Sequence, residues 1–528
     1  MSDVVEVPDG PLDGLLSRAA GRAPNQVAIR TESRDITYAQ LDQNADRIAV
    51  ALRARLGATG TAVGVASVLD PVFAAIFYGI SRSGNTIVMV NPMAREAIAQ
   101  HIFATAAITV AFVPVEMAQR LSSLRTKLTA LQTVVVIDLE EGESAPTGTV
   151  GLQQWLGDTA SGHPVSPIES SQDAVACIQF TSGTTGLPKA VQLTHRNLVA
   201  NAAQVAQAHR LSGASVAVNH LPLYHLMHLN AVVHAGATQV LCRDPDPVLS
   251  IVLAAKERAT HYYGLPARLN RLAEDPRLSE IDSVPGLEVI MSGGSVLTPA
   301  VATRLSAQLN VPVLQGYGLA ETSPLTHNDL PDRWRPGSVG PVVPGTECRI
   351  VDLDSGHVVG PGNRGEVQVR GPQLMAGYLA VPDSRDLDEE GWFHTGDVGY
   401  QDSHGWLFLV DRIKDVFKVD NELVSPTEVE DVIREHPDVV DCMVVDYPDP
   451  IRGAIVWAGV VPASREADLE DIAGLANCKL AEFQRVEIIE SLLAVPRSPI
   501  GKIQRKPVRE QLRAHASAAV EEAKNTVN

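Results

Sequence analysis

TSGTTGLPK, at residues 181–189, is the stretch from which the rest of the sequence can be interpreted. It follows the apolar run AVACIQF at 174–180, which is typical of a strand, and it precedes a helix expected to begin near Thr194. Small residues, hydroxyls and one ammonium at such a loop are the groups that bind a polyphosphate. Pro188 stands where a Walker loop has its second glycine, so the loop is of another kind. A flexible linker is disfavoured because linkers rarely combine so many hydroxyls with a flanking strand and helix. The predicted phosphate contacts are Thr181, Ser182, Gly183, Thr184, Thr185 and Lys189.

The composition is that of a globular protein and disfavours a nucleic-acid or membrane role. The 528 residues are 45% hydrophobic and 20% charged, and the formal net charge is -19. A chain of this length is expected to form at least two domains, and its negative charge repels phosphate backbones and anionic lipid. The scattered cysteines lack a C-x-x-C pair, and neither a signal-peptide pattern nor a membrane-spanning apolar run is present. We therefore expect a cytoplasmic protein with no membrane span and no nucleic-acid partner.

The sequence pattern differs between the N-terminal and the C-terminal parts of the chain. Short β-branched runs alternate with alanine-rich helical stretches in the N-terminal part, which predicts an α/β fold class with largely parallel strands. Glycine and proline turns between short strands predict a β-rich subdomain at about 337–411. We expect a large domain over 1–411 and a small α+β domain over 415–528, where a helix opens at Ser425-Pro426. The end of the chain, from about His515, is expected to fray.

Further motifs appear in a fixed order and carry a resemblance to a known family. They are LPLYHLMHL at 221–229, SGGS at 292–295, QGYGLAETSP at 315–324, GEVQVRG at 365–371, GWFHTGDVG at 391–399, DRIKD at 411–415 and PRSPIGKIQR at 496–505. Together with the phosphate loop they resemble the adenylate-forming superfamily of acyl-CoA synthetases, luciferases and peptide-synthetase adenylation domains, and most of all its acyl-CoA ligases. The resemblance implies an adenylation domain, a hinge at 412–414 and a mobile C-terminal domain. It also implies ATP, Mg²⁺ and coenzyme A as cofactors.

The same resemblance assigns the nucleotide contacts. Glu321 is expected to bind Mg²⁺, which takes few carboxylates besides phosphate oxygens, and Thr322 to bind the α-phosphate. Asp397 is expected to accept hydrogen bonds from both ribose hydroxyls, and Arg412 to reach the ribose. Without the other motifs, Glu321 and Thr322 would be interpreted as an ordinary helix start, and Asp397 as an aspartate in a turn. Two glycine-relieved turns form the adenine slot, with the tyrosine ring stacked on the base; they comprise Gly293, Gly294, Ser295, Gln315, Gly316, Tyr317 and Gly318.

Lys502 resembles the family lysine that closes over the active site, and Lys414 occupies the hinge position. Elsewhere, a lysine beside glycine would be a solvated surface residue. The implied reaction needs a mobile cation, because negative charge builds on the α-phosphate and on the attacking carboxylate. In-line attack yields an acyl-adenylate and pyrophosphate, and rotation of the C-terminal domain then admits a thiol. The residues expected to be catalytic are Lys502, His225, Thr322 and Glu321.

The acid substrate is predicted only as a class. His225 resembles the gate beside the substrate carboxylate, and Leu226 follows it where amino-acid-activating relatives have an aspartate. An α-amino acid is therefore disfavoured, because a buried ammonium without a counter-charge is costly. A fatty, aryl or other carbocyclic acid fits better. The stretch from 224 to 230 and the YYG motif are expected to line the acyl pocket, with Tyr224, His225, Leu226, Met227, Tyr262, Tyr263 and Gly264 as its named members.

The acceptor of the acyl group remains open at the level of sequence. Asn421 stands where the family usually has glycine, in the tunnel for the pantetheine arm of coenzyme A. Its side chain either narrows that tunnel or merely satisfies a left-handed turn. We expect a complete acid–CoA ligase; the alternative is a stand-alone ligase that performs one half-reaction or loads a carrier-protein thiol. A luciferase-like oxidation uses the same scaffold. A non-catalytic relic is disfavoured by the presence of Lys189, Glu321, Asp397, Arg412 and Lys502.

Overall fold

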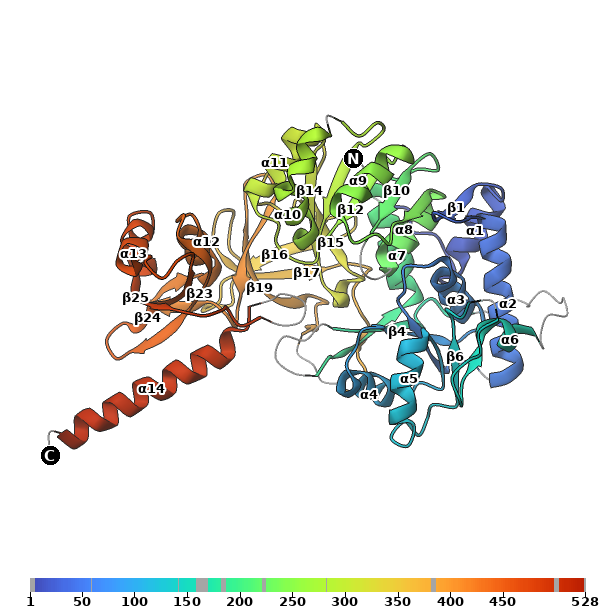
Figure 1. Ribbon diagram of the computed structural model, residues 1–528, viewed down its shortest axis with the longest axis horizontal. Coiled ribbons are helices and arrows are strands. Elements are labelled where there is room, and N and C mark those ends of the chain that lie inside the picture. The colour runs from blue at the N-terminus through green and yellow to red at the C-terminus, as the bar shows by residue number, and fades with distance from the viewer. Residues whose placement is uncertain are drawn as a thin grey trace. The chain divides into compact units, whose positions relative to one another are not determined.

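The computed structural model describes most of the chain (Figure 1). The described residues are 5–57, 59–140, 142–157, 170–181, 187–220, 225–281, 283–380, 386–497 and 503–526, with side chains up to residue 515. The chain divides into two compact units, of which the first comprises Met1–Cys348, Val369–His394 and Ser403–Leu407, and the second Arg349–Gln368, Thr395–Asp402 and Phe408–Asn528. The predicted domain bounds and the hinge stay predictions. Six predicted site residues lie outside the described residues: Ser182, Gly183, Thr184, Thr185, Tyr224 and Lys502.

The first unit contains two eight-stranded sheets, and the first sheet is parallel apart from its two edge strands. Its spatial order is β15 (Leu325–Asn328), β14 (Val313–Gly318), β13 (Val289–Ser292), β12 (His261–Gly264), β10 (Val216–Asn219), β11 (Thr238–Leu241), β1 (Val27–Arg30) and β2 (Asp35–Thr37). Strand β12 lies between β10 and β13, with Asn219 opposite Tyr263 and Gly264 opposite Ser292. The carboxyl ends of these strands therefore share one edge of the sheet, which in open α/β sheets is where ligands bind.

The second sheet combines parallel strands with an antiparallel edge. Its order is β18 (Gly377–Tyr378), β9 (Ala190–Thr194), β8 (Val175–Phe180), β4 (Thr86–Val90), β3 (Ala62–Ala66), β5 (Val110–Val113), β6 (Thr133–Val136) and β7 (Val150–Gly151). Strands β8 and β9 pair antiparallel, with Phe180 opposite Ala190. The phosphate loop thus connects two neighbouring strands, and its ends are held at one edge of the sheet.

Helices cover the faces of these sheets. They are α1 (Gly14–Arg22), α2 (Tyr38–Leu56), α3 (Pro71–Arg82), α4 (Glu96–Thr105), α5 (Val115–Leu124), α6 (Leu152–Gly157), α7 (His195–Ala208), α8 (Leu226–Ala235), α9 (Pro247–Lys256), α10 (Pro266–Glu274) and α11 (Pro299–Leu309), with the 3-10 turn η2 at Ala320–Thr322. Helix α7 begins as the sequence predicts, because the Thr194 hydroxyl accepts from the Asn197 N–H in a capping box. Successive residues of β12 face opposite layers: Tyr262 packs into the core with α9 to α11, and Tyr263 into the core with α8.

The second unit contains a four-stranded sheet whose strands extend across the division of the chain, a hairpin and a three-stranded sheet. The strands are β16 (Glu347–Val351), β17 (Gly365–Arg370), β19 (Phe393–Gln401) and β20 (Leu407–Arg412); β21 (Phe417–Val419) and β22 (Glu422–Val424); and β23 (Val439–Asp449), β24 (Gly453–Pro462) and β25 (Val486–Ser491). The helices are α12 (Pro426–Arg434), α13 (Leu469–Asn477) and α14 (Arg505–Thr526). The last of these is helical beyond His515, where the sequence predicts fraying.

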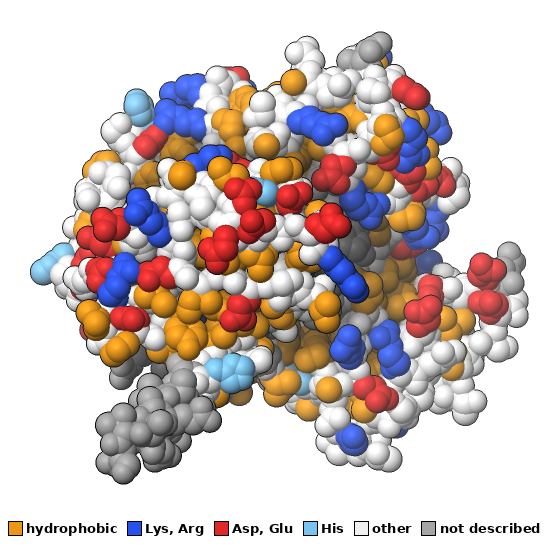
Figure 2. Space-filling model, turned by 60° about the vertical axis from the view of Figure 1, so that its left-hand side comes forward, with side chains coloured by type: hydrophobic (Ala, Val, Ile, Leu, Met, Phe, Trp, Pro, Cys, Tyr) orange, Lys and Arg blue, Asp and Glu red, His pale blue; other side chains and the backbone are white. Residues whose placement is uncertain are grey.

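The faces of β23 explain how this unit packs. Cys442 and Val444 belong to the core formed with α12 and α13, whereas Met443 and Val445 belong to the core that Leu512 of α14 joins. This alternation is what a strand covered on both sides requires. The mixed α/β fold class is thereby confirmed. Acidic and basic side chains are interspersed on the face shown in Figure 2. Within the described ranges, no helix combines the length and the apolar character needed to cross a bilayer.

Candidate functional site

The two ends of the phosphate loop are tied to one another. The Lys189 N–H donates to the Thr181 hydroxyl over 3.1 Å, and the Thr181 N–H donates to the Lys189 carbonyl over 3.0 Å. His101 of α4 adds a tether from outside, because its Nε2 lies 2.8 Å from the Pro188 carbonyl oxygen. A carbonyl can only accept, so Nε2 carries the proton. These contacts fix the positions at which the loop leaves and rejoins the sheet.

Lys189 and Glu321 meet at the same aromatic ring. The Lys189 ammonium lies 4.4 Å from the centroid of the Tyr378 ring and 3.0 Å from Asp386 Oδ2. The Tyr378 hydroxyl donates to Glu321 Oε1 over 2.8 Å, and that carboxylate is buried. A cation over an aromatic face and a charge-assisted hydrogen bond therefore converge on one residue. Tyr378 and Asp386 are not among the residues that the sequence predicts.

Burial, together with the contact to Tyr378, makes Glu321 a suitable single carboxylate for a divalent cation. Its backbone carbonyl accepts from the Met375 N–H over 2.8 Å, so both its side chain and its main chain are held by the segment around β18. Among the described side chains, no group of three or more His, Cys, Asp or Glu is placed to hold a metal ion. Mg²⁺ suits such a place, because it keeps several waters and takes one or two carboxylates plus phosphate oxygens.

Both predicted adenine turns need glycine for steric reasons. Gly294 has φ +85°, and a Cβ on Gly318 would lie 1.6 Å from the Pro324 carbonyl oxygen. Gln315 ties the two turns together, because its Oε1 accepts from the Leu297 N–H over 2.8 Å. The Tyr317 ring is buried, and its centroid lies 5.8 Å from that of His327. The structure therefore brings the two turns together, and their nucleotide contacts remain predictions.

Thr322 is fully buried, and its hydroxyl serves the turn in which it lies. That oxygen accepts from the Leu319 N–H over 2.9 Å and lies within hydrogen-bonding distance of the Leu319 and Pro324 carbonyl oxygens. In this arrangement the hydroxyl is occupied by the backbone around η2. Contact between Thr322 and the α-phosphate, as the sequence predicts, would require a change of hydrogen-bond partner.

The predicted acyl-pocket residues lie in two different layers. His225 caps α8, since its Nδ1 accepts from the Met227 N–H over 3.3 Å, and burial lowers the pKa of His225 to about 4. Tyr263 packs on the α8 side of the sheet, where its ring faces His228. Tyr262 points to the other layer, and its hydroxyl lies 2.7 Å from the Ser250 hydroxyl. Leu226 is buried, and Gly264 leaves room for Leu269, which a Cβ would approach to 2.8 Å.

In the second unit, the structure brings Asp397 and Arg412 together. They extend from β19 and β20, which are neighbours in the four-stranded sheet, and Arg412 Nε lies 2.6 Å from Asp397 Oδ1. The Asp397 carboxylate is buried, and its N–H donates to the Thr395 hydroxyl over 3.1 Å. A carboxylate offers two acceptor oxygens, as hydrogen bonds to two ribose hydroxyls require.

The predicted hinge and tunnel residues also lie in the second unit. The carbonyl oxygen of Lys414 accepts from Arg509 of α14 over 3.1 Å. Asn421 is exposed, with φ +68°, and follows Asp420 with φ +50° in the turn between β21 and β22. Two left-handed residues in a two-residue hairpin are what a type I′ turn demands, and asparagine and aspartate meet that demand well. This geometry accounts for Asn421 without a tunnel, and its place beside a pantetheine arm stays a prediction.

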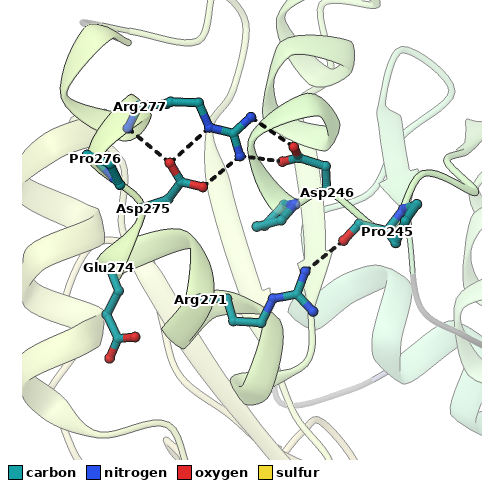
Figure 3. Close-up of a pocket in the computed structure, with 8 residues that line it drawn as sticks. Pro245, Asp246, Arg271, Glu274, Asp275, Pro276 and Arg277 are labelled. Atoms are coloured by element: carbon teal, nitrogen blue, oxygen red, sulfur yellow. Dashed lines mark hydrogen bonds and ion pairs between the residues drawn. The ribbon is translucent and has the colours of Figure 1, made fainter.

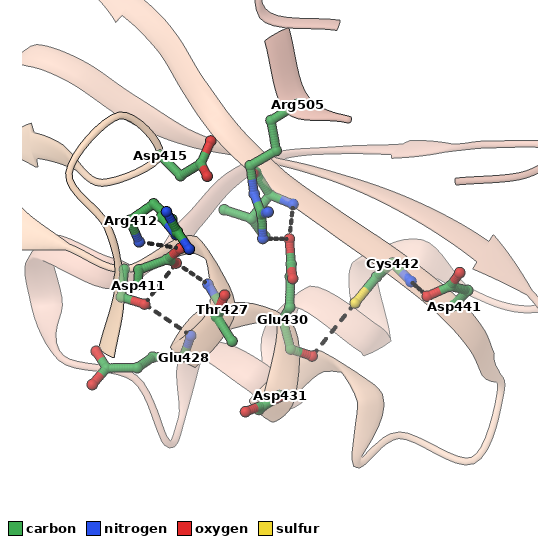
Figure 4. A network of polar contacts seen from close by, with 12 residues as sticks. Asp411, Arg412, Asp415, Thr427, Glu428, Glu430, Asp431, Asp441, Cys442 and Arg505 are labelled. Carbon is green, nitrogen blue, oxygen red and sulfur yellow. Dashed lines mark hydrogen bonds and ion pairs between the residues drawn. The ribbon is translucent and has the colours of Figure 1, made fainter. Parts of the chain in front are cut away.

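A network of polar contacts includes Arg505, the first residue of α14 (Figure 4). This helix follows Lys502 in the sequence. Glu430 accepts from the Val444 N–H over 2.8 Å, and its Oε1 lies 2.7 Å from Arg505 Nη2, with both side chains buried. Asp411 accepts from the Ser425 hydroxyl and from the Thr427 N–H, each over 3.1 Å. Arg505 is the first residue of α14, so the pair with Glu430 fixes the C-terminal end of the segment that carries Lys502. Lys502 itself lies outside the described residues.

A surface pocket in the first unit is separate from the predicted site residues, none of which lines it (Figure 3). Arg277 lies between Asp246 and Asp275, at 2.9 and 2.7 Å, and Arg271 donates to the Pro245 carbonyl over 2.8 Å. Arg277 therefore pairs with both aspartates of this pocket. Asp246 also accepts from the Val248 N–H at the start of α9, and Asp275 from the Arg277 N–H at the start of the 3-10 turn Pro276–Glu280. The pocket is thus explained by local structure.

Comparison with known proteins identifies similar chains. The AMP-binding enzyme family model matches residues 16–379, and the AMP-binding enzyme C-terminal domain model matches residues 428–502. 4-Coumarate–CoA ligase 2 of Oryza sativa subsp. japonica is 33% identical over 402 residues, which cover 72% of this chain and 70% of that protein.

Solved structures resemble the chain over almost its whole length. The anthranilate CoA ligase AuaEII, solved in complex with anthranoyl-AMP, is 25% identical, with a TM-score of 0.85 and coverage of 96% of this chain and 98% of that chain. The amide bond synthetase McbA from Marinactinospora thermotolerans is 26% identical, with a TM-score of 0.82 and coverage of 95% and 100%. Similar chains therefore include proteins named for different acyl acceptors.

Proposed function

The chain belongs to the AMP-binding enzyme family, and we propose that it is an ATP-dependent carboxylic acid–CoA ligase. The carboxylate attacks the α-phosphorus of ATP, the bond to the β-phosphate breaks, and acyl-AMP and pyrophosphate form. The thiol of coenzyme A then attacks the acyl carbonyl, loses its proton and releases AMP. The contacts of Lys189 and Glu321 with Tyr378 carry this proposal, because the Lys189 ammonium lies 4.4 Å from the ring centroid and the buried Glu321 carboxylate accepts from the hydroxyl of the same residue.

The charges of this cluster suit a polyphosphate with a divalent cation. Glu321, Asp386 and Lys189 contribute two carboxylates and one ammonium, so a bare polyphosphate would meet repulsion there. Mg²⁺ bound at Glu321 and the phosphates would neutralise that charge and polarise the phosphoryl oxygens. Lys189 and the phosphate loop then hold the departing pyrophosphate, and Lys502 supplies charge at the reacting α-phosphate.

The ribose is assigned to the second unit. Asp397 accepts hydrogen bonds from the ribose hydroxyls, and Arg412 orients that carboxylate, as their 2.6 Å contact supports. His225, fixed by its capping hydrogen bond, stands beside the acyl carboxylate. Rotation about the segment 412–414 lets Lys502 leave before the thiol arrives. Each of these roles is carried over from the family resemblance.

A second acceptor class follows from the likeness to an amide bond synthetase. In that case the acyl-adenylate is discharged by an amine, and coenzyme A takes no part. The chemistry of the first step is identical for both, so only the acceptor separates them. A carrier-protein thiol is a third acceptor, which would likewise take the place of coenzyme A. Coenzyme A is favoured because the related rice protein and the anthranilate enzyme are both named for it.

A pyrophosphate-release assay tests the proposal. Purified protein, MgATP and a panel of aryl, fatty and alicyclic acids are incubated with no acceptor, with coenzyme A, or with a primary amine, and the products are identified by mass spectrometry. We expect acid-dependent pyrophosphate release in every arm and acyl-CoA with AMP in the coenzyme A arm. Amide formed in preference to thioester would replace the ligase proposal. Absence of acid-dependent pyrophosphate release across the panel would overturn adenylation itself.

A further inference from the structure

A row of four rings leads inward from the edge of the first sheet. The His225 ring centroid lies 5.7 Å from that of His228, and the His228 centroid lies 4.2 Å from that of Tyr263. The Tyr263 hydroxyl lies 3.1 Å from His209 Nδ1. We call His225, His228, Tyr263 and His209 the ring row. Three elements that are distant in sequence, namely the end of α7, the start of α8 and strand β12, supply its members.

The ring row lies where an open α/β sheet binds its ligand. Tyr263 is the penultimate residue of β12, and His225 and His228 open the helix that follows β10, so the row begins at the shared carboxyl edge of these strands. His225 is also the residue expected beside the substrate carboxylate. The rest of the row, from His228 to His209, therefore runs from the reacting end of the acid toward its tail.

Two histidines at this edge leave ring nitrogens unused. His228 Nδ1, and both ring nitrogens of His220, have no hydrogen-bond partner within the part of the chain that the structure describes. Both side chains are more than nine-tenths buried. A buried polar atom without a partner costs stability, so such atoms call for an explanation in terms of a ligand or a catalytic role. At a substrate edge, the explanation is a polar group on the acid.

The imidazoles at this edge are held neutral by burial, and the nearby charge of Arg268 lowers the pKa of His220 further. Burial lowers the pKa of His209 to about 3 and that of His220 to about 3, and burial also lowers the pKa of His228 far below its usual value. Neutral imidazoles offer one donor and one acceptor each. They provide no counter-charge for a cationic tail, and beside His228, whose electrostatic neighbours are the other histidines, an anionic tail would first require an imidazole to take up a proton against this desolvation.

We infer that the ring row forms a wall of the acid-binding site, and that the acid carries a compact aromatic tail with a neutral hydrogen-bonding substituent such as a phenolic hydroxyl. The inference rests on the proposed function and names its substrate class. Consecutive flat rings favour stacking with an aromatic tail, and the unused nitrogen of His228 selects a tail with a hydrogen-bonding group. His228 is thereby assigned as a specificity-determining residue.

Four matched acids test this class with the wild-type protein. They are 3-(4-hydroxyphenyl)propanoate, 3-phenylpropanoate, octanoate and heptanedioate, and the readout is kcat/KM for pyrophosphate release. This readout does not depend on the acyl acceptor. We expect the hydroxyphenyl acid to exceed the phenyl acid by about tenfold or more, because a site built to hydrogen-bond a hydroxyl rejects the analogue that lacks it. Octanoate and heptanedioate are expected to be poorer than both.

Variants at His228 test whether this side chain causes the expected preference for the hydroxyphenyl acid over the phenyl acid. His228→Leu should lower kcat/KM for the hydroxyphenyl acid about tenfold more than for the phenyl acid, and His228→Gln, which keeps a neutral hydrogen-bonding group, should restore much of the difference. Because the substitution by leucine removes a buried nitrogen that has no partner, the melting temperature of the variant should not fall below that of the wild-type protein. If His228→Leu fails to fold, His228→Phe preserves a flat ring and answers the same question.

His195→Gln is the matched control. His195 is a buried histidine of α7 outside the ring row, and its Nδ1 accepts from the Leu12 N–H over 3.0 Å. Its replacement should leave the ratio between the two aryl acids unchanged. A wild-type preference for octanoate or heptanedioate, or an unaltered ratio in folded His228→Leu, overturns the inference while the proposed ligase stands. Failure of every acid, in this set and in the wider panel, would instead count against the proposed function.

Discussion

Replacement of Tyr378 by phenylalanine isolates the link between Lys189 and Glu321. The variant keeps the aromatic ring that lies 4.4 Å from the Lys189 ammonium and removes only the hydroxyl that donates to Glu321 over 2.8 Å. The cation–π contact is therefore preserved. The Glu321 carboxylate loses the hydrogen bond from Tyr378 while it stays buried, and its orientation is no longer fixed from that side.

The expected size of the effect follows from the charge of the acceptor. A hydrogen bond to a charged group contributes about 1.5–3 kcal/mol, against about 0.5–1.5 kcal/mol between neutral groups. We expect Tyr378→Phe to lower the free energy of unfolding by about 2 kcal/mol. If Glu321 binds Mg²⁺ with the phosphates, the loss of orientation should raise KM for MgATP by about tenfold, while KM for the acid changes little.

Tyr38→Phe provides the control. The Tyr38 hydroxyl is also buried, and it donates to the Ala237 carbonyl over 2.6 Å. This neutral pair should show a smaller loss of stability and no change in KM for MgATP. Denaturant titration gives the stability, and pyrophosphate release at several Mg²⁺ concentrations gives the kinetic constants. Equal KM values for MgATP in Tyr378→Phe and wild type, at limiting and at saturating Mg²⁺, would refute the assignment of Glu321 to the metal.

Further perturbations test other parts of the site. Asp397→Asn should weaken AMP binding, measured by calorimetry, because the ribose loses an ionised acceptor; unchanged affinity would remove this residue from the ribose site. Glu430→Gln leaves Arg505 buried without its counter-charge and should destabilise the second unit by about 3–5 kcal/mol in a thermal scan. Asn421→Gly should speed thiolation of a supplied acyl-adenylate if a side chain narrows the tunnel, and identical single-turnover rates would leave only the turn requirement. The native state keeps His209 neutral down to about pH 3, whereas an unfolded histidine binds a proton below about 6.5, so stability is lost as pH falls through this window. His209→Gln should remove about 2 kcal/mol of that loss at pH 5, and parallel stability curves for the two proteins would contradict it.

Local rules predicted much of the fold because they act over a few residues. The helix expected near Thr194 begins there through a capping box, and the helix expected at Ser425-Pro426 begins with the Ser425 hydroxyl bound to the Glu428 N–H. At the end of the chain the expectation came instead from the general behaviour of termini, which often fray. The structure has α14 continuing to Thr526, as the helix propensity of alanine and glutamate permits.

The site was less predictable, because its main contacts depend on the pairing of distant strands. Tyr378 reaches Lys189 and Glu321 because β18 pairs with β9, with Tyr378 opposite Val191. Register of this kind is set by the whole sheet rather than by the motif. Neighbouring residues in the YYG motif were assigned to one pocket, although side chains alternate along a strand and only Tyr263 lies on the α8 side. That alternation could have been applied to the sequence.

The contacts around Lys189 differ in how easily a nucleotide can replace them. The pair with Asp386 is half-exposed, at 51% and 36% side-chain exposure, and such pairs contribute no more than about 1 kcal/mol. A polyphosphate can therefore take the ammonium from Asp386 at small cost. The bond between Tyr378 and Glu321 is buried and is kept whether or not Lys189 changes partner. The cluster thus combines one exchangeable ion pair with one fixed carboxylate, as a site that binds and releases a charged nucleotide in every turnover requires.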